Sequence, residues 1–164
     1  MATFSVDNID IDTDIRDAQW QIMSELNALV KAAVSAAMSE HMPQPFSEIS
    51  LLFTSDEHMR NLNRDYREQD KSTNVLSFPT QNTVCALVLP VLGDIVLAFE
   101  TIEREANERG ISLADHTTHL IIHGYLHLQG LDHQNNEEAE AMEALEINVL
   151  EHLGIANPYA KDAS

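Results

Sequence analysis

Three histidines lie close together in the sequence, at spacings that suit a metal ion. His123 and His127 fall within residues 113–128, which are predicted to form a buried helix, and residues four apart share one helix face. Gly130 follows the predicted helix end and can adopt a left-handed conformation that turns the chain back and brings His133 toward the other two. Three neutral imidazoles with open positions form the ligand set of a catalytic zinc. We therefore predict one Zn²⁺, or another divalent metal, at these three histidines, the alternative being three unrelated surface or core residues.

The residue that follows the first histidine argues against one class of zinc peptidase. The frame H-x-x-x-H-x-x-G-x-x-H is typical of these enzymes, in which Glu stands after the first His and acts as the general base. Here that position is Gly124, which cannot deprotonate water. In a helix Gly also costs about 1 kcal/mol relative to Ala. Two explanations are open: a substrate or another backbone approaches closely, or the helix packs tightly.

Several motifs occur together in this sequence: His119 with His123-Gly-x-Leu-His127-Leu-x-Gly-x-Asp132-His133, then Leu62-Asn63, Tyr66-Arg67, Asp70-Lys71, Thr73-Asn74-Val75-Leu76-Ser77-Phe78-Pro79, and Leu92-Gly93-Asp94-Ile95. Together they resemble the motifs of the YbeY family, which comprises bacterial rRNA maturation factors and metal-dependent endoribonucleases. The resemblance spans roughly residues 47–159.

The resemblance implies an activity and a set of partners. It implies a single-strand-specific metallo-endoribonuclease that acts in 16S rRNA 3′-end maturation and late ribosome quality control. It assigns Arg67 as the functional arginine and points to single-stranded rRNA and the small ribosomal subunit as substrate. Ribosomal proteins and GTPase assembly factors are further candidate partners. It also implies one mixed sheet covered by helices, with the metal site in a cleft.

Four basic residues form a stripe that could bind phosphate groups. They are Arg60, Arg64, Arg67 and Lys71, spaced four, three and four residues apart. Arg suits bidentate phosphate contact, so we predict substrate binding by Arg67, Lys71 and Arg64. The alternative is a solvated helix face whose cations pair with Glu57, Asp65 and Glu68.

His119 lies one helical turn before His123 and could orient a metal ligand or contact substrate. The family resemblance favours a role in the substrate cleft. His116 is predicted to be a helix-surface residue, and Asp132 to stabilise the turn that follows the helix.

Composition sets a frame for these predictions. A chain of 164 residues fits a single domain, here a metal-dependent hydrolase domain over residues 1–164. The formal charge of -18 disfavours nucleic acid unless cations gather locally. A single cysteine, Cys85, fits a reducing cytoplasm. The first ten residues lack the features of a signal peptide, and no apolar run is long enough to span a membrane.

The hydrophobic pattern predicts an α+β (α/β-like) fold with about four strands and about five helices. Strands are expected at residues 3–6, 46–54, 72–78 and 95–98. Helices are expected at residues 15–38, 55–66, 100–108, 113–128 and 137–153.

The predicted reaction is hydrolysis of an RNA phosphodiester by metal-activated water, with Arg67 holding the phosphate as it gains charge. The sequence indicates no general base. Two alternatives are open: a metal-dependent hydrolase of another class, such as a peptidase, or a non-enzymatic ribosome-assembly factor with a structural metal.

Overall fold

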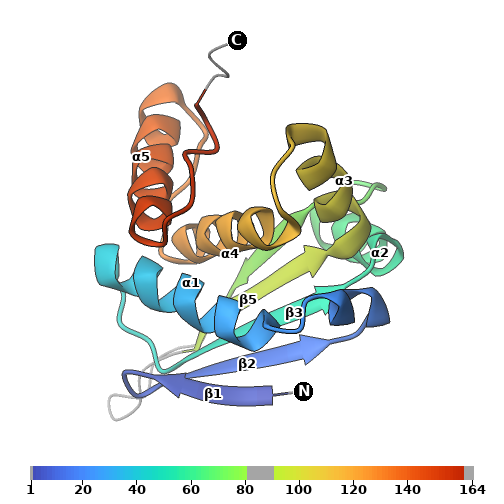
Figure 1. Ribbon diagram of the computed structural model, residues 1–164, viewed down its shortest axis with the longest axis horizontal. Helices are drawn as coiled ribbons and strands as arrows, with labels where there is room; N and C mark the ends of the chain where they lie inside the picture. The colour runs from blue at the N-terminus through green and yellow to red at the C-terminus, as the bar shows by residue number, and fades with distance from the viewer. Residues whose placement is uncertain (1, 81–90, 161–164) are drawn as a thin grey trace.

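The structure is a computed structural model that describes residues 2–80 and 91–160. Its centre is one mixed sheet (Figure 1), which consists of β1 (Ala2–Val6), β2 (Ile9–Ile15), β3 (Glu48–Thr54), β4 (Val75–Pro79) and β5 (Val91–Ala98). In space the strands follow the order β1-β2-β3-β5-β4. The two inner pairs are parallel, and the edge strands β1 and β4 pair antiparallel with their neighbours. Cys85 lies outside the described residues.

Helices surround this sheet. They are the 3₁₀ helix η1 (Ala18–Ile22) and the α-helices α1 (Leu26–Glu40), α2 (Asp56–Arg67), α3 (Phe99–Arg109), α4 (Leu113–Leu128) and α5 (Asn136–His152). Helix α4 is central, because it contacts α1, α3 and α5 as well as β4 and β5 (Figure 1). Within the part of the chain that the structure describes, no helix has the length and apolar character needed to cross a membrane.

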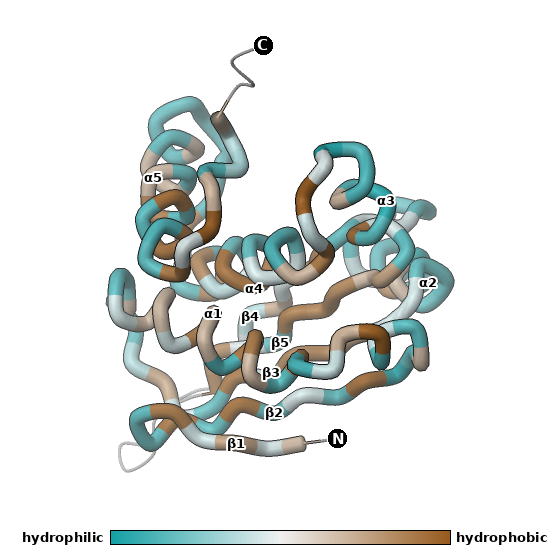
Figure 2. Tube along the Cα trace, viewed as in Figure 1, coloured by the Kyte–Doolittle hydropathy of each residue, from teal (hydrophilic) through white to brown (hydrophobic). Residues whose placement is uncertain are grey.

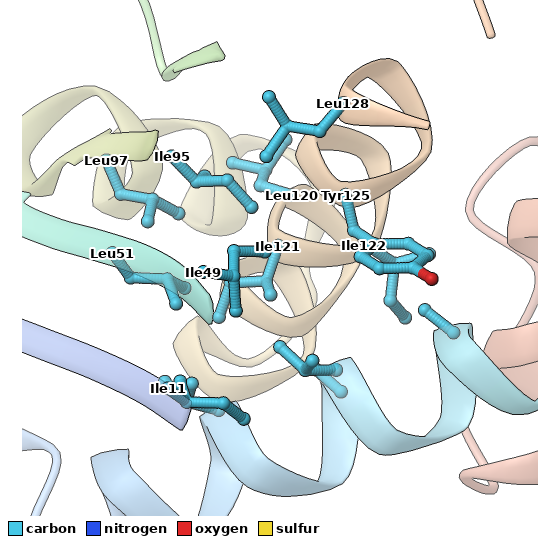
Figure 3. Packing of buried hydrophobic residues seen from close by; sticks show 14 of the residues in the cluster. Ile11, Ile49, Leu51, Ile95, Leu97, Leu120, Ile121, Ile122, Tyr125 and Leu128 are labelled. Carbon is cyan, nitrogen blue, oxygen red and sulfur yellow. The ribbon is translucent and has the colours of Figure 1, made fainter. Parts of the chain in front are cut away.

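The main core lies between the sheet and helices α1 and α4. Residues alternate between the two faces along a strand, and Ile49, Leu51 and Phe53 of β3 are all buried on this side. Figure 3 shows Ile49 directed toward Ile121 of α4. Burying an Ile or Leu side chain contributes about 1.5–3 kcal/mol. Several such side chains on α4 therefore outweigh the helix-propensity cost of Gly124.

A smaller core lies on the opposite face of the sheet, under α2. Met59 packs there with Val96 and Ala98 of β5 and with the partly buried Leu76 of β4. Figure 2 shows hydrophobic segments along β5 and hydrophilic segments on the outer turns of α5. The sheet is therefore covered on both faces near β4 and β5, by α4 on one side and by α2 on the other.

The predicted fold class is confirmed, with one strand more than expected. Strand β2 was missed because its acidic residues obscured the alternation Ile-Asp-Ile-Asp-Thr-Asp-Ile, in which Ile9, Ile11 and Thr13 are buried. The helix predicted at residues 15–38 was wrong at its start. There β2 extends to Ile15 and is followed by η1. The indole N–H of Trp20 in η1 donates a hydrogen bond to the carbonyl oxygen of Thr54 at 2.9 Å.

Candidate metal centre

The three histidines of the sequence prediction converge at the C-terminal end of α4. Each of His123, His127 and His133 offers one ring nitrogen, and these atoms all lie within 4.8 Å of one another. The ring centroids of His123 and His127 are 4.6 Å apart, and that of His133 is 5.7 Å and 5.1 Å from them. In the described part of the chain, this is the group of His, Cys, Asp and Glu side chains with the geometry to hold a metal ion.

A turn built around Gly130 brings His133 back to the helix. Gly130 has φ +98°, a left-handed conformation that side chains disfavour. The Leu131 N–H donates to the Leu126 carbonyl at 3.0 Å, which closes the helix end. Asp132 Oδ1 then accepts a hydrogen bond from the His133 N–H at 2.8 Å, as expected for a residue that stabilises the turn.

The nitrogens of this cluster fit a divalent cation. His123 Nε2 and His127 Nε2 are 3.1 Å apart, so a proton or a cation must lie between their lone pairs. Burial lowers the pKa of the His127 imidazole, and repulsion from His123 and His133 lowers it further. A neutral imidazole is the form that binds zinc and other divalent transition metals.

A buried carboxylate, that of Glu146, contacts the cluster, and the sequence had not indicated it. Glu146 of α5 is fully buried, and its Oε1 lies 2.5 Å from His123 Nδ1. Burial raises the pKa of Glu146, but hydrogen bonds with His119, His123 and Tyr159 outweigh burial and lower it to about 2. The available signal was a Glu on the apolar face of α5, four residues after Met142 and three before Val149.

A cavity of about 640 Å³ opens beside the three histidines. Its lining includes Arg67 and Lys71, two of the predicted substrate-binding residues, and also Asp132. Arg64 and His119 are not among the described residues that line it. The structure therefore brings one arginine and one lysine to the cavity beside the three histidines and leaves Arg60 and Arg64 outside it.

The stripe divides because its arginines have different partners. Arg60 makes a bidentate ion pair with Asp70, with distances of 2.8 Å and 3.0 Å, and Arg64 pairs with Asp65. Arg67 has no carboxylate among its partners in the described residues. Its Nη2 donates to the carbonyl oxygen of Ser77 at 2.7 Å, and its guanidinium lies 5.4 Å from the centre of the Phe78 ring. Arg67 is thus held against β4 by a neutral acceptor and an aromatic ring.

The loop after α2 delivers Lys71 to the same cavity. Glu68 ends the helix in a left-handed conformation, with φ +58°. The side chain of Asn63, which is 4% exposed, then donates to the Lys71 carbonyl at 2.8 Å and fixes the loop.

The two remaining histidines of α4 are buried. The prediction of a surface position for His116 was wrong, because its ring is 1% exposed and its Nε2 lies 2.9 Å from Glu105 Oε1. Burial lowers the pKa of His116. His119 is 6% exposed and faces Glu146 and Tyr159, and it does not line the cavity beside the three clustered histidines.

Tight packing explains Gly124. A Cβ at this position would lie 3.0 Å from Ile95 Cγ2 and 3.2 Å from Ser77 Oγ. The Ser77 hydroxyl also donates to the Gly124 carbonyl at 3.2 Å. The glycine therefore allows α4 to approach β4 and β5 closely, which resolves the two explanations in favour of packing.

Fold and site together define a class: small α+β proteins in which a three-histidine centre, able to hold a metal ion, adjoins a cavity with an arginine. The sequence pattern of the family described as Endoribonuclease YbeY matches residues 12–154. This chain belongs to the YbeY family. The resemblance inferred from the motifs is thus confirmed, and the match begins further toward the N-terminus than the motifs indicated.

Individual relatives agree with this assignment. The chain is 44% identical to Endoribonuclease YbeY of Agrobacterium fabrum over 93% of this chain and 95% of that protein. It is 44% identical to Endoribonuclease YbeY of Rhizobium etli, over 92% and 93% of the two chains. A solution structure of a Thermotoga maritima protein matches the fold with a TM-score of 0.54 at 20% identity, covering 92% of this chain and 99% of that one.

Proposed function

We propose that this chain is a metal-dependent endoribonuclease, a single hydrolase domain that cleaves phosphodiester bonds of single-stranded rRNA. The main support is that three histidines of this chain converge beside a cavity lined by Arg67 and Lys71. The chain belongs to a family described as Endoribonuclease YbeY. The activity named for the relatives matches what this arrangement can do chemically. We further propose Zn²⁺ as the metal and His123, His127 and His133 as its ligands.

Each part of the cavity has a role in this reaction. His123, His127 and His133 would hold a divalent ion, which would supply Lewis acidity, lower the pKa of bound water and offset negative charge. Arg67 and Lys71 bind the phosphate, and Arg67 stabilises the charge that develops on it. The contact with Ser77 holds the Arg67 side chain in place before substrate binds. Substrate binding by Arg64 and by His119 stays a prediction from the sequence.

The geometry favours a catalytic metal over a structural one. Structural zinc sites are closed by four protein ligands, whereas catalytic sites keep a position open. Three residues make up the ligand group in the described part of the chain, and all three line the cavity. Zinc peptidases with the matching frame carry a general-base Glu at the position of Gly124. Here the position lacks such a side chain and packs against the sheet, which argues against a peptidase.

The biological setting is part of the proposal. We place the activity in the cytoplasm, in 16S rRNA 3′-end maturation and late quality control on the small ribosomal subunit. A protein of charge -18 has weak attraction for free RNA. A ribosomal protein or a GTPase assembly factor that presents the RNA end would compensate for this.

An RNA-cleavage assay tests the proposal. Purified wild type, His127→Ala and a chelator-treated sample, with and without added Zn²⁺, are incubated with single-stranded RNA and with small-subunit particles. We expect cleavage by wild type, loss in the variant, and recovery of the chelated sample on adding Zn²⁺. Equal cleavage in all samples would indicate a contaminating nuclease, and particle binding without cleavage would favour an assembly factor.

A further inference from the structure

Glu146 is fully buried, yet it lies next to a proposed metal ligand and outside the cavity that receives substrate. It is carried by α5, which packs against α4. A buried carboxylate is costly unless donors surround it. The groups that contact the Glu146 carboxylate therefore indicate what it does in this protein.

Both oxygens of the Glu146 carboxylate are occupied. Oε1 lies 2.5 Å from His123 Nδ1 and 3.6 Å from His119 Nε2. Oε2 accepts a hydrogen bond from the Tyr159 hydroxyl at 2.5 Å. Tyr159 belongs to the segment after α5, so this carboxylate joins two helices and the end of the described chain.

The positions of the protons follow from these contacts. The Tyr159 hydroxyl donates to Glu146, so its oxygen is left to accept from His119 Nε2 at 3.3 Å. His119 Nδ1 is buried and has no hydrogen-bond partner among the described residues, so this ring engages through Nε2. At His123, the carboxylate requires a proton on Nδ1. The lone pair of His123 is therefore on Nε2, which faces His127 Nε2 at 3.1 Å.

We infer that Glu146 is a positioning residue that holds His123 in the Nδ1–H tautomer and directs its Nε2 lone pair at the metal, while Tyr159 and His119 hold Glu146 in place. Carboxylates behind metal-binding histidines fix ring orientation and strengthen the ligand, and their loss costs about 10–100-fold in metal affinity. This inference rests on the metal centre proposed above. It gives a role to Glu146 of α5 and to Tyr159 in the segment that follows the helix.

A purely architectural role makes a different prediction. If the Glu146 contacts served only to join α5 to α4, their loss would lower the melting temperature while leaving the tautomer of His123 and the metal affinity unchanged. Both quantities can be measured on the full chain without any activity assay.

The experiment compares wild type, Glu146→Gln and Tyr159→Phe, with Glu140→Gln as control. Glu140 is an exposed carboxylate on the same helix, so its variant makes the same change of charge. Long-range ¹⁵N NMR of the histidine side chains reports the tautomer in metal-free protein, and competition with a chromophoric chelator gives the affinity for Zn²⁺. Circular dichroism and thermal melting establish that each variant is folded.

We expect the Nδ1–H tautomer of His123 in wild type and Glu140→Gln. Glu146→Gln, whose amide can also donate, should show mixed tautomers and bind Zn²⁺ about 10-fold more weakly. Tyr159→Phe should weaken binding less, because the carboxylate remains.

Three results would overturn the inference: an Nε2–H tautomer of His123 in wild type, unchanged Zn²⁺ affinity in folded Glu146→Gln, or, if that variant does not fold, unchanged affinity in Tyr159→Phe. Failure of wild type to bind Zn²⁺ would instead reject the metal centre itself, and the wild-type tautomer would still test the role of Glu146.

Discussion

Arg67 differs from the other arginines of α2 in how it is held. Arg60 and Arg64 have carboxylate partners, whereas Arg67 contacts a backbone carbonyl and the face of Phe78. A neutral acceptor and an aromatic ring orient a guanidinium without cancelling its charge. The local structure therefore keeps a positive charge available for a phosphate.

Replacing Arg67 should affect chemistry far more than folding. Because the side chain is exposed and its contacts are few, we expect Arg67→Ala to lower the melting temperature by at most a few degrees. Because its charge faces the proposed phosphate position, activity should fall by about 100-fold or more. Thermal melting and RNA cleavage measure the two effects. The control is Arg104→Ala, an exposed cation on α3. A large loss of stability in Arg67→Ala would reassign the residue to architecture.

Residue-level prediction succeeded where local spacing carried the information. The histidine pair on one helix face, the Gly130 turn and the cluster with His133 follow from positions within eleven residues of sequence. Glu146 and Tyr159 were missed because their partners lie far away in sequence. Tyr159 reaches His119 across 40 positions, and Glu146 reaches His123 across 23. Such contacts depend on how α5 docks, which hydrophobic spacing alone does not determine.

Among the elements, the close contact of α4 with β4 and β5 positions His123 and His127, two of the three clustered histidines. Gly124 lies between His123 and His127, so the helical turn that carries these histidines also packs against Ile95 and Ser77. Displacing the helix from the sheet would move these histidines relative to Arg67, which donates a hydrogen bond to the Ser77 carbonyl oxygen.

We expect Gly124→Ala to destabilise the protein despite the better helix propensity of Ala. The added methyl group meets buried Ile95, and overpacking of this kind costs about 1–3 kcal/mol. Ala returns about 1 kcal/mol of propensity. The free energy of unfolding should therefore fall by about 1 kcal/mol in a urea titration, and RNA cleavage should fall with it. A gain in stability would show that α4 can shift without strain.

Elements were predicted well where the pattern was long and apolar, and poorly where charges interrupted it. Helix α4 matches its predicted bounds, because Leu, Ile and His positions repeat over four turns and Ser112 caps its start. The parallel pairing of β2 with β3, by contrast, is a tertiary preference that overrides a local surplus of aspartates.

At the scale of the whole molecule, charge is distributed unevenly. The chain carries 27 acidic and 9 basic residues, yet both Arg67 and Lys71 line the cavity beside the histidines. The remaining acidic surface repels a polyanion, so RNA should be held through few contacts.

Binding of single-stranded RNA should consequently depend only modestly on salt. Each neutralised phosphate contributes about -0.7 to the slope of log K against log salt, so two contacts give about -1.4. Fluorescence anisotropy with the cleavage-deficient His127→Ala variant measures it. Adding Lys71→Ala should make the slope less negative by about 0.7. Lys31 is an exposed lysine on α1, and adding Lys31→Ala should leave the slope unchanged. A slope of about -5 would require a much larger basic surface.

The most direct measurement is the metal content and coordination of the purified protein. Elemental analysis and X-ray absorption are applied to wild type, His127→Ala and His133→Ala. We expect one divalent ion per wild-type chain, bound by three imidazole nitrogens and at least one non-protein ligand, and strong loss of metal in both variants. Full metal occupancy in both variants, or four protein ligands in wild type, would contradict it.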